Sequence, residues 1–423
     1  MSTFLRVKST REVLEIVRKF QPLGAETVPL GRAWGRVLAE PVHSREPVPH
    51  FPRATMDGYA VRARDSFGAS ENLPALLEVS GHVCMGEGYA GEVEPGKAVS
   101  IPTGGILPAG ADAVVMIEFT HPLDETTIEV FKPVAPGENV LGIGEDIAEG
   151  QEVFPRGRRL RSQDVGVLAA LGLPEIPVYR RPRVAVLSTG DEILPAFTPS
   201  LPPGKVRDIN SFTLAAMVEE SSAVVGTCGI LCDHLDSLVS ACCDALDRHE
   251  VLILSGGSSV GSRDLTIEVL ERLADAQILV HGIAVRPGKP TILARVDDKL
   301  VWGLPGQPVS AVMIFQTFVR PSLERLQGLE GVDFADSGFP RPAVLNRRLP
   351  SVHGRTDLVP VILSREDSTW LATPVFGKSA MIHVLARSDG YVLVPEHVEG
   401  LDQGTPVNVY PYSLRGGSVG QGG

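Results

Sequence analysis

The sequence predicts a multidomain protein that combines a doubly wound α/β domain with β-rich domains and a helical N-terminal segment. The chain has 423 residues, too many for one ordinary hydrophobic core, so two to four domains are expected. Between residues 183 and 326, short apolar runs alternate with helical patterns, as in a parallel sheet covered by helices. Elsewhere, short strands are separated by glycine and proline (44 Gly and 34 Pro in the chain), which favour turns.

The N-terminal region predicts a helix followed by a β-rich insertion. Residues 9–12, Ser-Thr-Arg-Glu, form a capping-box pattern that opens an amphipathic helix. A second helical pattern appears at residues 164–171. Because these two helices could pack together, we expect a helical N-terminal domain made of residues 1–24 and 151–181. Residues 25–150 would then be an inserted β-rich domain.

The region from 182 to 330 carries the α/β pattern, with apolar strand runs that include 184–187 and 251–254. In such a sheet, ligands bind at the carboxyl ends of the strands, where the loops meet helix N-termini. After residue 331 short strands return, and we expect a small C-terminal β-barrel over residues 331–414. Residues 415–423 read as a flexible tail.

Composition excludes several functions. The chain has 39 basic and 51 acidic residues, a net charge of −12, which argues against a sequence-independent nucleic-acid binder. The five cysteines form no CxxC pair and are expected to be reduced thiols. The N-terminus lacks a signal-peptide pattern, and the longest apolar-rich stretch, 309–319, is too short to span a bilayer. We therefore expect a soluble, cytoplasmic protein with no membrane partner.

Two strand-end loops predict a phosphate and metal site. Ser188–Glu192 follows the first strand, and Ser255–Gly261 follows the second, with Asp264 just beyond. Glycines such as Gly256 and Gly257 let backbone N–H groups approach a phosphate, and nearby carboxylates can hold a hydrated Mg²⁺. The alternative is that the glycines only form a turn and that Asp264 only caps a helix.

Two further loops predict an anion site. Residues 286–290, Arg-Pro-Gly-Lys-Pro, place Arg286 and Lys289 beside a restricted backbone. The loop Gly303–Ser310 joins a strand to a long helix, so Ser310 lies in a first helical turn. The alternatives are that Arg286 and Lys289 only contribute surface charge and that Ser310 only caps its helix. The sharper hypothesis is one phosphate-sized anion near all four loops.

The inserted region contains polar turns at residues 56–60 (MDGYA), 102–105 (PTGG) and 144–147 (GEDI). Each alone is most simply a turn. Read in order with STGDE, the Gly-Gly-x-Ser loop, RPGKP and GLPG-x-PVSA, however, these motifs resemble the molybdopterin molybdenumtransferases, the MoeA family that includes the E domain of gephyrin. The resemblance extends from the N-terminal helix to about Tyr410.

The resemblance implies a four-domain, elongated homodimer whose α/β domain is like the molybdopterin-adenylating proteins MogA and MoaB. The implied active cleft lies between that domain of one subunit and the inserted domain of the other. The implied reaction takes adenylylated molybdopterin and molybdate, and yields molybdenum cofactor and AMP with Mg²⁺. A molybdopterin adenylyltransferase would be the partner that delivers the nucleotide.

The resemblance also assigns roles to individual residues. Mg²⁺ and the pyrophosphate would be handled by Glu192, Asp233 and Asp264. Phosphate would be cradled by Gly256, Gly257 and Ser259. Molybdate would be received by residues of the anion loops and the C-terminal domain: Arg286, Lys289, Pro290, Pro305, Ser310, Arg355, Lys378 and Ser379. Asp57, Thr103 and Asp146 would complete the cleft from the partner subunit.

The sequence departs from the family pattern at several positions. Ser258 stands where the family usually has Val, and Gln307 where it usually has Asn. Residues 141–143 replace arginines that many members carry. These departures leave two alternatives open: a divergent paralogue that binds pterin or nucleotide without inserting metal, and a nucleotidyltransferase or hydrolase acting on ATP. Tungstate also remains open as the oxyanion.

Overall fold

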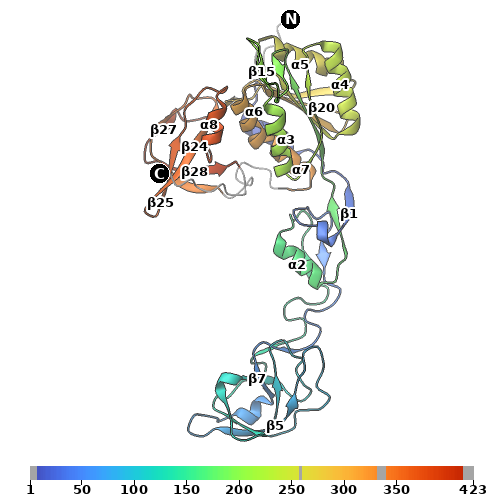
Figure 1. Ribbon diagram of the computed structural model, residues 1–423, viewed down its shortest axis with the longest axis vertical. Helices are drawn as coiled ribbons and strands as arrows, with labels where there is room; N and C mark the ends of the chain where they lie inside the picture. The colour runs from blue at the N-terminus through green and yellow to red at the C-terminus, as the bar shows by residue number, and fades with distance from the viewer. Residues whose placement is uncertain (1–6, 257–259, 331–339, 413–423) are drawn as a thin grey trace.

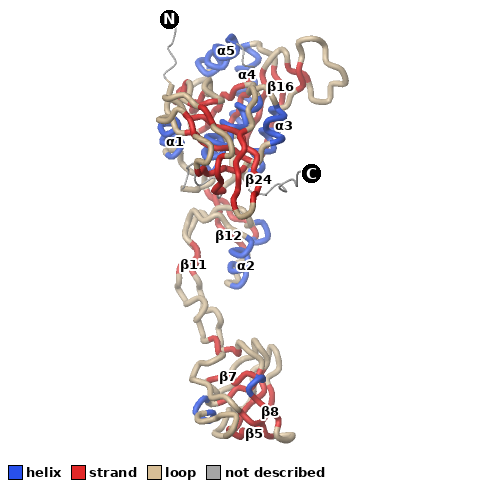
Figure 2. Tube along the Cα trace, turned by 90° about the vertical axis from the view of Figure 1, so that its left-hand side faces the viewer, coloured by secondary structure: helices blue, strands red, loops and turns tan. Residues whose placement is uncertain are grey.

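The computed structural model describes residues 7–256, 260–330 and 340–412, and the side chains of residues 260–264 lie outside that description. The protein is elongated (Figures 1 and 2). One end holds the α/β sheet and the C-terminal barrel. A narrow connector follows, and a separate β-rich part, here called the distal lobe (residues 53–141), forms the other end. The proposed tail, 415–423, lies outside the described residues.

The α/β sheet has six strands in the order β16-β13-β17-β21-β20-β18. The first four are mutually parallel, whereas β20 and β18 run antiparallel to their neighbours. The expectation of a parallel sheet is therefore corrected to a mixed one, because a tight turn at Asp297, with φ of 51°, joins β20 directly to β21. The strands are β13 (Arg183–Thr189), β16 (Val224–Leu231), β17 (Val251–Gly256), β18 (Ala276–His281), β20 (Ile292–Val296) and β21 (Lys299–Pro305).

Helices cover both faces of this sheet, as the doubly wound prediction requires. One hydrophobic core joins the sheet to α3, α6 and α7, and the other joins it to α4 and α5. The predicted long helix continues from α6 to α7 through a π segment at Phe315–Val319. Pro321 follows that segment, and the wider turn accommodates a residue that lacks an N–H. The helices are α3 (Asn210–Glu220), α4 (Leu235–Arg248), α5 (Val260–Arg272), α6 (Pro308–Ile314) and α7 (Arg320–Leu326).

The C-terminal region forms the predicted small barrel. Its sheet runs β24-β25-β22-β28-β26, and a further pairing of β24 with β26 closes it. A short strand, β19 (Val285–Arg286), leaves the α/β domain and pairs in parallel with β24, so the two parts share backbone hydrogen bonds. The barrel elements are β22 (Arg341–Leu345), β24 (Thr356–Glu366), β25 (Thr369–Pro374), α8 (Ile382–Arg387), β26 (Gly390–Val394) and β28 (Pro406–Pro411), with a β23–β27 pair at Leu349–Pro350 and Gly400–Leu401.

The distal lobe is built on a six-stranded sheet in the order β7-β4-β6-β5-β9-β8. Alternating buried positions of these strands form its own core around Leu77 and Ile128. The strands are β4 (Gly58–Val61), β5 (Ala75–His82), β6 (Lys97–Ile101), β7 (Ala113–Met116), β8 (Thr120–Pro122) and β9 (Thr127–Val130), and β3 (Arg53–Ala54) pairs with β10 (Val140–Leu141) at the junction with the connector.

The connector contains the second predicted helix, α2 (Ser162–Ala170), but not the first. It is closed by the pairs β1–β12 (Ala25–Pro29 with Glu175–Tyr179) and β2–β11 (Val42–His43 with Glu152–Phe154). The expected packing of residues 1–24 on 151–181 is wrong for α1 (Thr10–Arg18), which contacts α7 and shares the α/β core. Hydrogen bonds between Lys8 and the 282–284 loop hold the start of the chain there, at 3.0 and 2.7 Å.

The capping box at residues 9–12 is confirmed: the Glu12 amide donates to Ser9 Oγ at 3.2 Å, and the Ser9 amide donates to Glu12 Oε2 at 2.7 Å. Within the part of the chain that the structure describes, no helix is long and apolar enough to cross a bilayer.

Asp164 stabilises the connector and yields a pH-dependent prediction. Its carboxylate is 2% exposed and accepts hydrogen bonds from Arg158 and Arg161. Burial alone would raise the pKa of Asp164, but the hydrogen bonds from Arg161 and Arg158 outweigh it and hold that pKa well below its usual range. Asp164→Asn should cost about 2 kcal/mol locally, a roughly 30-fold loss of amide protection in α2 at pH 7.

Because the folded-state pKa is depressed, this contribution is present above the unfolded pKa of about 4 and is lost as the pH falls below it. Hydrogen exchange of peptides covering 162–170, corrected for intrinsic rates, should therefore show the variant and wild type converging toward low pH. Glu15→Gln in the exposed Arg11–Glu15 pair is the matched control and should change nothing in α2. Equal protection of both proteins at pH 7 would contradict the prediction.

Candidate functional site

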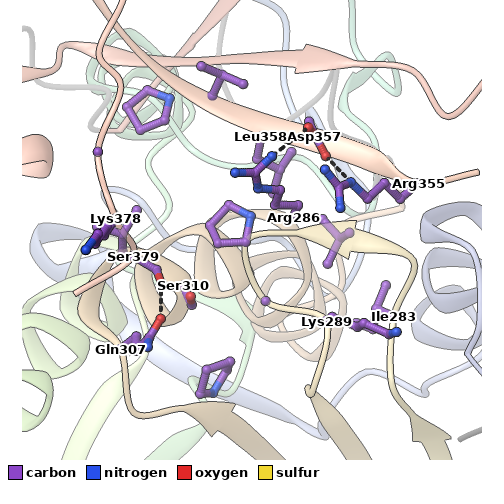
Figure 3. Close-up of a pocket in the computed structure, with 18 of the residues that line it drawn as sticks. Ile283, Arg286, Lys289, Gln307, Ser310, Arg355, Asp357, Leu358, Lys378 and Ser379 are labelled. Atoms are coloured by element: carbon purple, nitrogen blue, oxygen red, sulfur yellow. Dashed lines mark hydrogen bonds and ion pairs between the residues drawn. The ribbon is translucent and has the colours of Figure 1, made fainter. Parts of the chain in front are cut away.

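A large cavity lies where the α/β loops meet the barrel. Its volume is about 1120 Å³. The RPGKP loop and the segment after β21 form one side, and β24 and the loop before α8 form the other (Figure 3). Eight residues predicted to bind substrate line this cavity: Arg286, Lys289, Pro290, Pro305, Ser310, Arg355, Lys378 and Ser379.

Two cations of the cavity, Arg286 and Arg355, lie beside one buried carboxylate, Asp357. Arg355 Nε donates to Asp357 Oδ1 at 2.9 Å, and Arg286 Nη1 lies 3.9 Å from Asp357 Oδ2. The side chain of Asp357 is only 4% exposed, whereas that of Arg286 is 65% exposed. The pairing of β19 with β24 sets this arrangement, because it places Arg286 opposite Asp357. The two guanidinium groups are thereby held at the cavity while their charge is only partly neutralised.

The RPGKP loop depends on its glycine. Gly288 has φ of +112°, and a Cβ atom there would lie 2.4 Å from Ile314 of α6. A larger residue would therefore push the loop away from the helix. This close approach lets Arg286 and Lys289 line the same cavity as the first turn of α6.

Ser310, Gln307 and Ser379 lie together in the cavity wall, where the segment after β21 meets the loop before α8 (Figure 3). The Ser379 hydroxyl donates to the Gln307 side-chain carbonyl, and the Val309 amide donates to the Ser379 carbonyl at 3.1 Å. Ser310 is 4% exposed at the start of α6. The departure at Gln307 thus connects the helix start to the barrel. With Lys378 nearby, cations and hydroxyls surround a cavity suited to a small oxyanion.

The cavity also adjoins the start of the Gly-rich loop. Gly256, the last residue of β17, is paired with Pro305 on one side and with Thr189 on the other. Gly257 and Ser259 lie outside the described residues, as does the side chain of Asp264 in α5. Their predicted phosphate and metal roles therefore stay predictions.

Two of the predicted carboxylates, Glu192 and Asp233, lie just beyond the ends of β13 and β16. The Asp233 amide donates to Asp191 Oδ1 at 3.1 Å. Burial raises the pKa of Asp233, and the negative charges of Asp191 and Glu192 raise it further. Among the residues that the structure describes, no three His, Cys, Asp or Glu side chains form a metal-binding group. Neighbouring carboxylates that repel one another are nevertheless the donors that Mg²⁺ prefers.

Asp57, Thr103 and Asp146 are not brought to the cavity. Asp57 Oδ1 accepts the Thr103 amide at 2.7 Å, and this backbone hydrogen bond, with one from the Thr103 side chain, lowers the pKa of the exposed Asp57. Asp146, beyond β10, donates its amide to the Val48 carbonyl at 3.2 Å. Asp57 and Thr103 belong to the distal lobe, remote from the barrel in both views (Figures 1 and 2).

Sequence reasoning missed Asp357, His353 and Asn210. Asp357 and His353 line the cavity, and Asn210 is buried where the α/β loops meet. The spacing of Arg355 and Asp357 is a usable signal, because residues two apart at the start of an extended segment point to the same side. A charged pair at the start of an apolar strand indicates such a shared face. Asn210 opens α3, where the sequence indicates no more than a helix cap formed by Asn210 or Ser211.

The sequence and the fold both match known proteins. Residues 8–172 match the family described as "MoeA N-terminal region (domain I and II)", residues 185–325 match "Probable molybdopterin binding domain", and residues 342–412 match "MoeA C-terminal region (domain IV)". The molybdopterin molybdenumtransferase of Bacillus subtilis is 33% identical over 403 residues, covering 94% of this chain and 92% of that protein. Molybdopterin molybdenumtransferase 2 of Mycobacterium tuberculosis (H37Rv) is 34% identical over 412 residues, covering 95% and 97%.

Two solved structures of molybdopterin biosynthesis MoeA proteins from Pyrococcus horikoshii are similar over 96% of this chain and 100% of theirs. One has a TM-score of 0.78 at 37% identity, and the other 0.82 at 31% identity. The likeness covers the α/β domain, the barrel, the connector and the distal lobe together, so it extends well beyond a shared α/β domain. The chain belongs to the MoeA family and is a molybdopterin molybdenumtransferase of molybdenum-cofactor biosynthesis.

Proposed function

We propose that the enzyme inserts molybdate into adenylylated molybdopterin and releases AMP in a Mg²⁺-dependent reaction. The observation that carries this proposal is the cavity in which Arg286, Lys289, Arg355 and Lys378 meet the hydroxyls of Ser310 and Ser379. Such a set of donors and cations suits a tetrahedral dianion. Because Gly256 pairs with Pro305 at its edge, the phosphate-binding loop would begin beside the bound oxyanion.

Two different groups of residues would screen the negative charges of molybdate and of the pyrophosphate. Molybdate and the pyrophosphate repel each other, so both must be screened before the bond to AMP breaks. The cavity cations would neutralise and orient molybdate, while Gly256, Gly257 and Ser259 would donate hydrogen bonds to the phosphates. Glu192, Asp233 and Asp264 would hold Mg²⁺, which supplies positive charge to the phosphates when bound. A metal shared with phosphates does not require a complete protein cage.

Two subunits would form each complete site. Asp57, Thr103 and Asp146 lie too far along the elongated chain to line their own cavity, and none of them does. In a homodimer, the distal lobe of one subunit would complete the cleft of the other. A molybdopterin adenylyltransferase would deliver the nucleotide, and tungstate, with nearly the size and charge of molybdate, would compete for the cavity.

The first test is molybdate-dependent AMP release from adenylylated molybdopterin. Wild type should release AMP when molybdate and Mg²⁺ are added, and Asp264→Ala should lose at least 100-fold in rate because the metal loses a ligand. Binding of the nucleotide without release, in molybdate and in tungstate, would favour a pterin-binding paralogue. Turnover of ATP without any pterin would instead favour a nucleotidyltransferase or hydrolase.

The second test concerns the oxyanion cavity. Arg355→Gln should weaken molybdate binding about 10- to 100-fold, as expected for loss of one charge-assisted hydrogen bond. Isothermal titration with molybdate measures this directly. Arg348→Gln is the matched control: it removes an arginine of the same barrel whose side chain is 76% exposed, lies outside the cavity lining and pairs with the exposed Asp402 at 3.5 Å. If both variants bind molybdate equally more weakly, the effect comes from net charge alone, and the cavity is not the molybdate site.

The third test concerns the shared cleft. Asp57→Asn and Asp264→Ala should each be inactive, but a mixture of the two should regain activity because hybrid dimers contain one intact site. Random mixing yields about one quarter of the wild-type sites. AMP release after co-refolding or co-expression measures the recovery. Absence of recovery, when light scattering shows that hybrid dimers have formed, would place all site residues within one subunit.

A further inference from the structure

The loops of the proposed site are joined by one buried side chain, that of Asn210. This residue opens α3 and is 8% exposed. Its Nδ2 atom donates to Ser255 Oγ at 2.8 Å and to the Gly306 carbonyl at 2.9 Å. A side-chain amide has two N–H donors, so both are used and the orientation of the amide is fixed.

The two acceptors belong to loops with different proposed tasks. Ser255 precedes Gly256 at the end of β17, where the phosphate-binding loop begins. Gly306 lies between Pro305 and Gln307, both of which line the oxyanion cavity. The Asn210 amide therefore spans the boundary between the nucleotide side and the oxyanion side of the site.

A second buried group, Asp208, fixes the first turn of α3, the turn that carries Asn210. Asp208 is 6% exposed, and its carboxylate accepts hydrogen bonds from Ser188 Oγ at 2.9 Å and from the Ser211 amide at 3.2 Å. The Ser211 hydroxyl donates to the other oxygen of the same carboxylate. Ser188 lies on β13, just before the loop that carries Glu192. The first turn of α3 is thus tied to the ends of β13, β17 and β21.

We propose that Asn210 is a positioning residue that fixes the distance between bound oxyanion and bound phosphate. This inference rests on the proposed function, because it assigns the two loops to molybdate and to the adenylylated substrate. The amide contacts the two loops and is not among the residues that line the cavity, so its removal should displace one ligand relative to the other without deleting a binding contact. A misplacement of about 1 Å is enough to slow a reaction roughly 100-fold.

The test separates rate from affinity. Asn210→Ala should lower the single-turnover rate of AMP release about 100-fold at saturating molybdate and nucleotide. The dissociation constants of tungstate and of AMP, measured separately by calorimetry, should each change less than about threefold, a shift below 1 kcal/mol. A merely structural role would weaken binding together with the rate.

Asn346→Ala is the matched control. Asn346 is also a partly buried amide, and its Nδ2 donates to Thr373 Oγ1 at 2.6 Å, but it lies in the barrel and outside the cavity lining. The Asn346→Ala variant should lose about as much folding stability as Asn210→Ala and release AMP at the wild-type rate. Ser255→Ala removes only one acceptor and keeps the bond to Gly306, so it should show a smaller loss of rate, about 10-fold, even where Asn210→Ala fails to fold.

The outcomes distinguish failure of this inference from failure of the proposed function on which it rests. Wild type that releases no AMP with molybdate overturns the proposed function. Wild type that is active, together with Asn210→Ala or Ser255→Ala within about threefold of its rate, overturns only the positioning role of Asn210. Loss of affinity large enough to explain the loss of rate overturns it as well.

Discussion

The parallel alignment of β13, β17 and β21 is the constraint on which the rest of the structure depends. Parallel strands deliver all their carboxyl ends to one edge of a sheet, so the loops that follow must meet there. In this chain the ends of these strands and the loops after them carry Glu192, Gly256 and Ser310, and more than 50 positions of sequence separate each of these residues from the next. Helices pack their apolar sides on both faces of the sheet and leave the polar loops at its edge accessible to a ligand.

A second, smaller constraint turns this edge into a cavity. The parallel pairing of β19 with β24 attaches the barrel to the α/β domain through backbone hydrogen bonds. It also brings Arg286 of one part beside Asp357 of the other. Two arginines around one buried carboxylate keep net positive charge at the cavity, and the fixed carboxylate limits how far the guanidinium groups can move. An acidic protein, with a net charge of −12, can in this way present a locally cationic site.

Much of the fold could be predicted because local patterns reported local structure. The apolar runs at β13 and β17, the capping box at Ser9 and the helical period of α2 each follow from neighbouring residues. The partner of an amphipathic helix is not encoded locally, and α1 was therefore assigned to the wrong neighbour. The antiparallel direction of β20 relative to β21 was predictable in principle, since Asp297-Asp298 between two apolar runs is a hairpin signal.

The site was predicted unevenly for the same reason. Motif order identified the residues that line the cavity, because each lies in a loop with its own pattern of glycine, proline and charge. Asn210 has no such pattern around it, and the pattern at Asp357 shows only that it shares a face with Arg355. The importance of both residues comes from partners far away in sequence. Only the folded chain shows that one amide joins two loops and that one carboxylate serves two arginines.

The short antiparallel pairs that lead into the distal lobe have an evolutionary consequence. Because β2 pairs with β11 and β3 with β10, the chain enters and leaves this lobe through adjacent strands. The lobe has a core of its own, so a single insertion into an ancestral gene could add it without disturbing the strand register of the connector. By the same geometry, its deletion would leave two ends close enough to rejoin by a tight turn. The lobe is thus a unit that genomes can gain, lose or exchange in one recombination event.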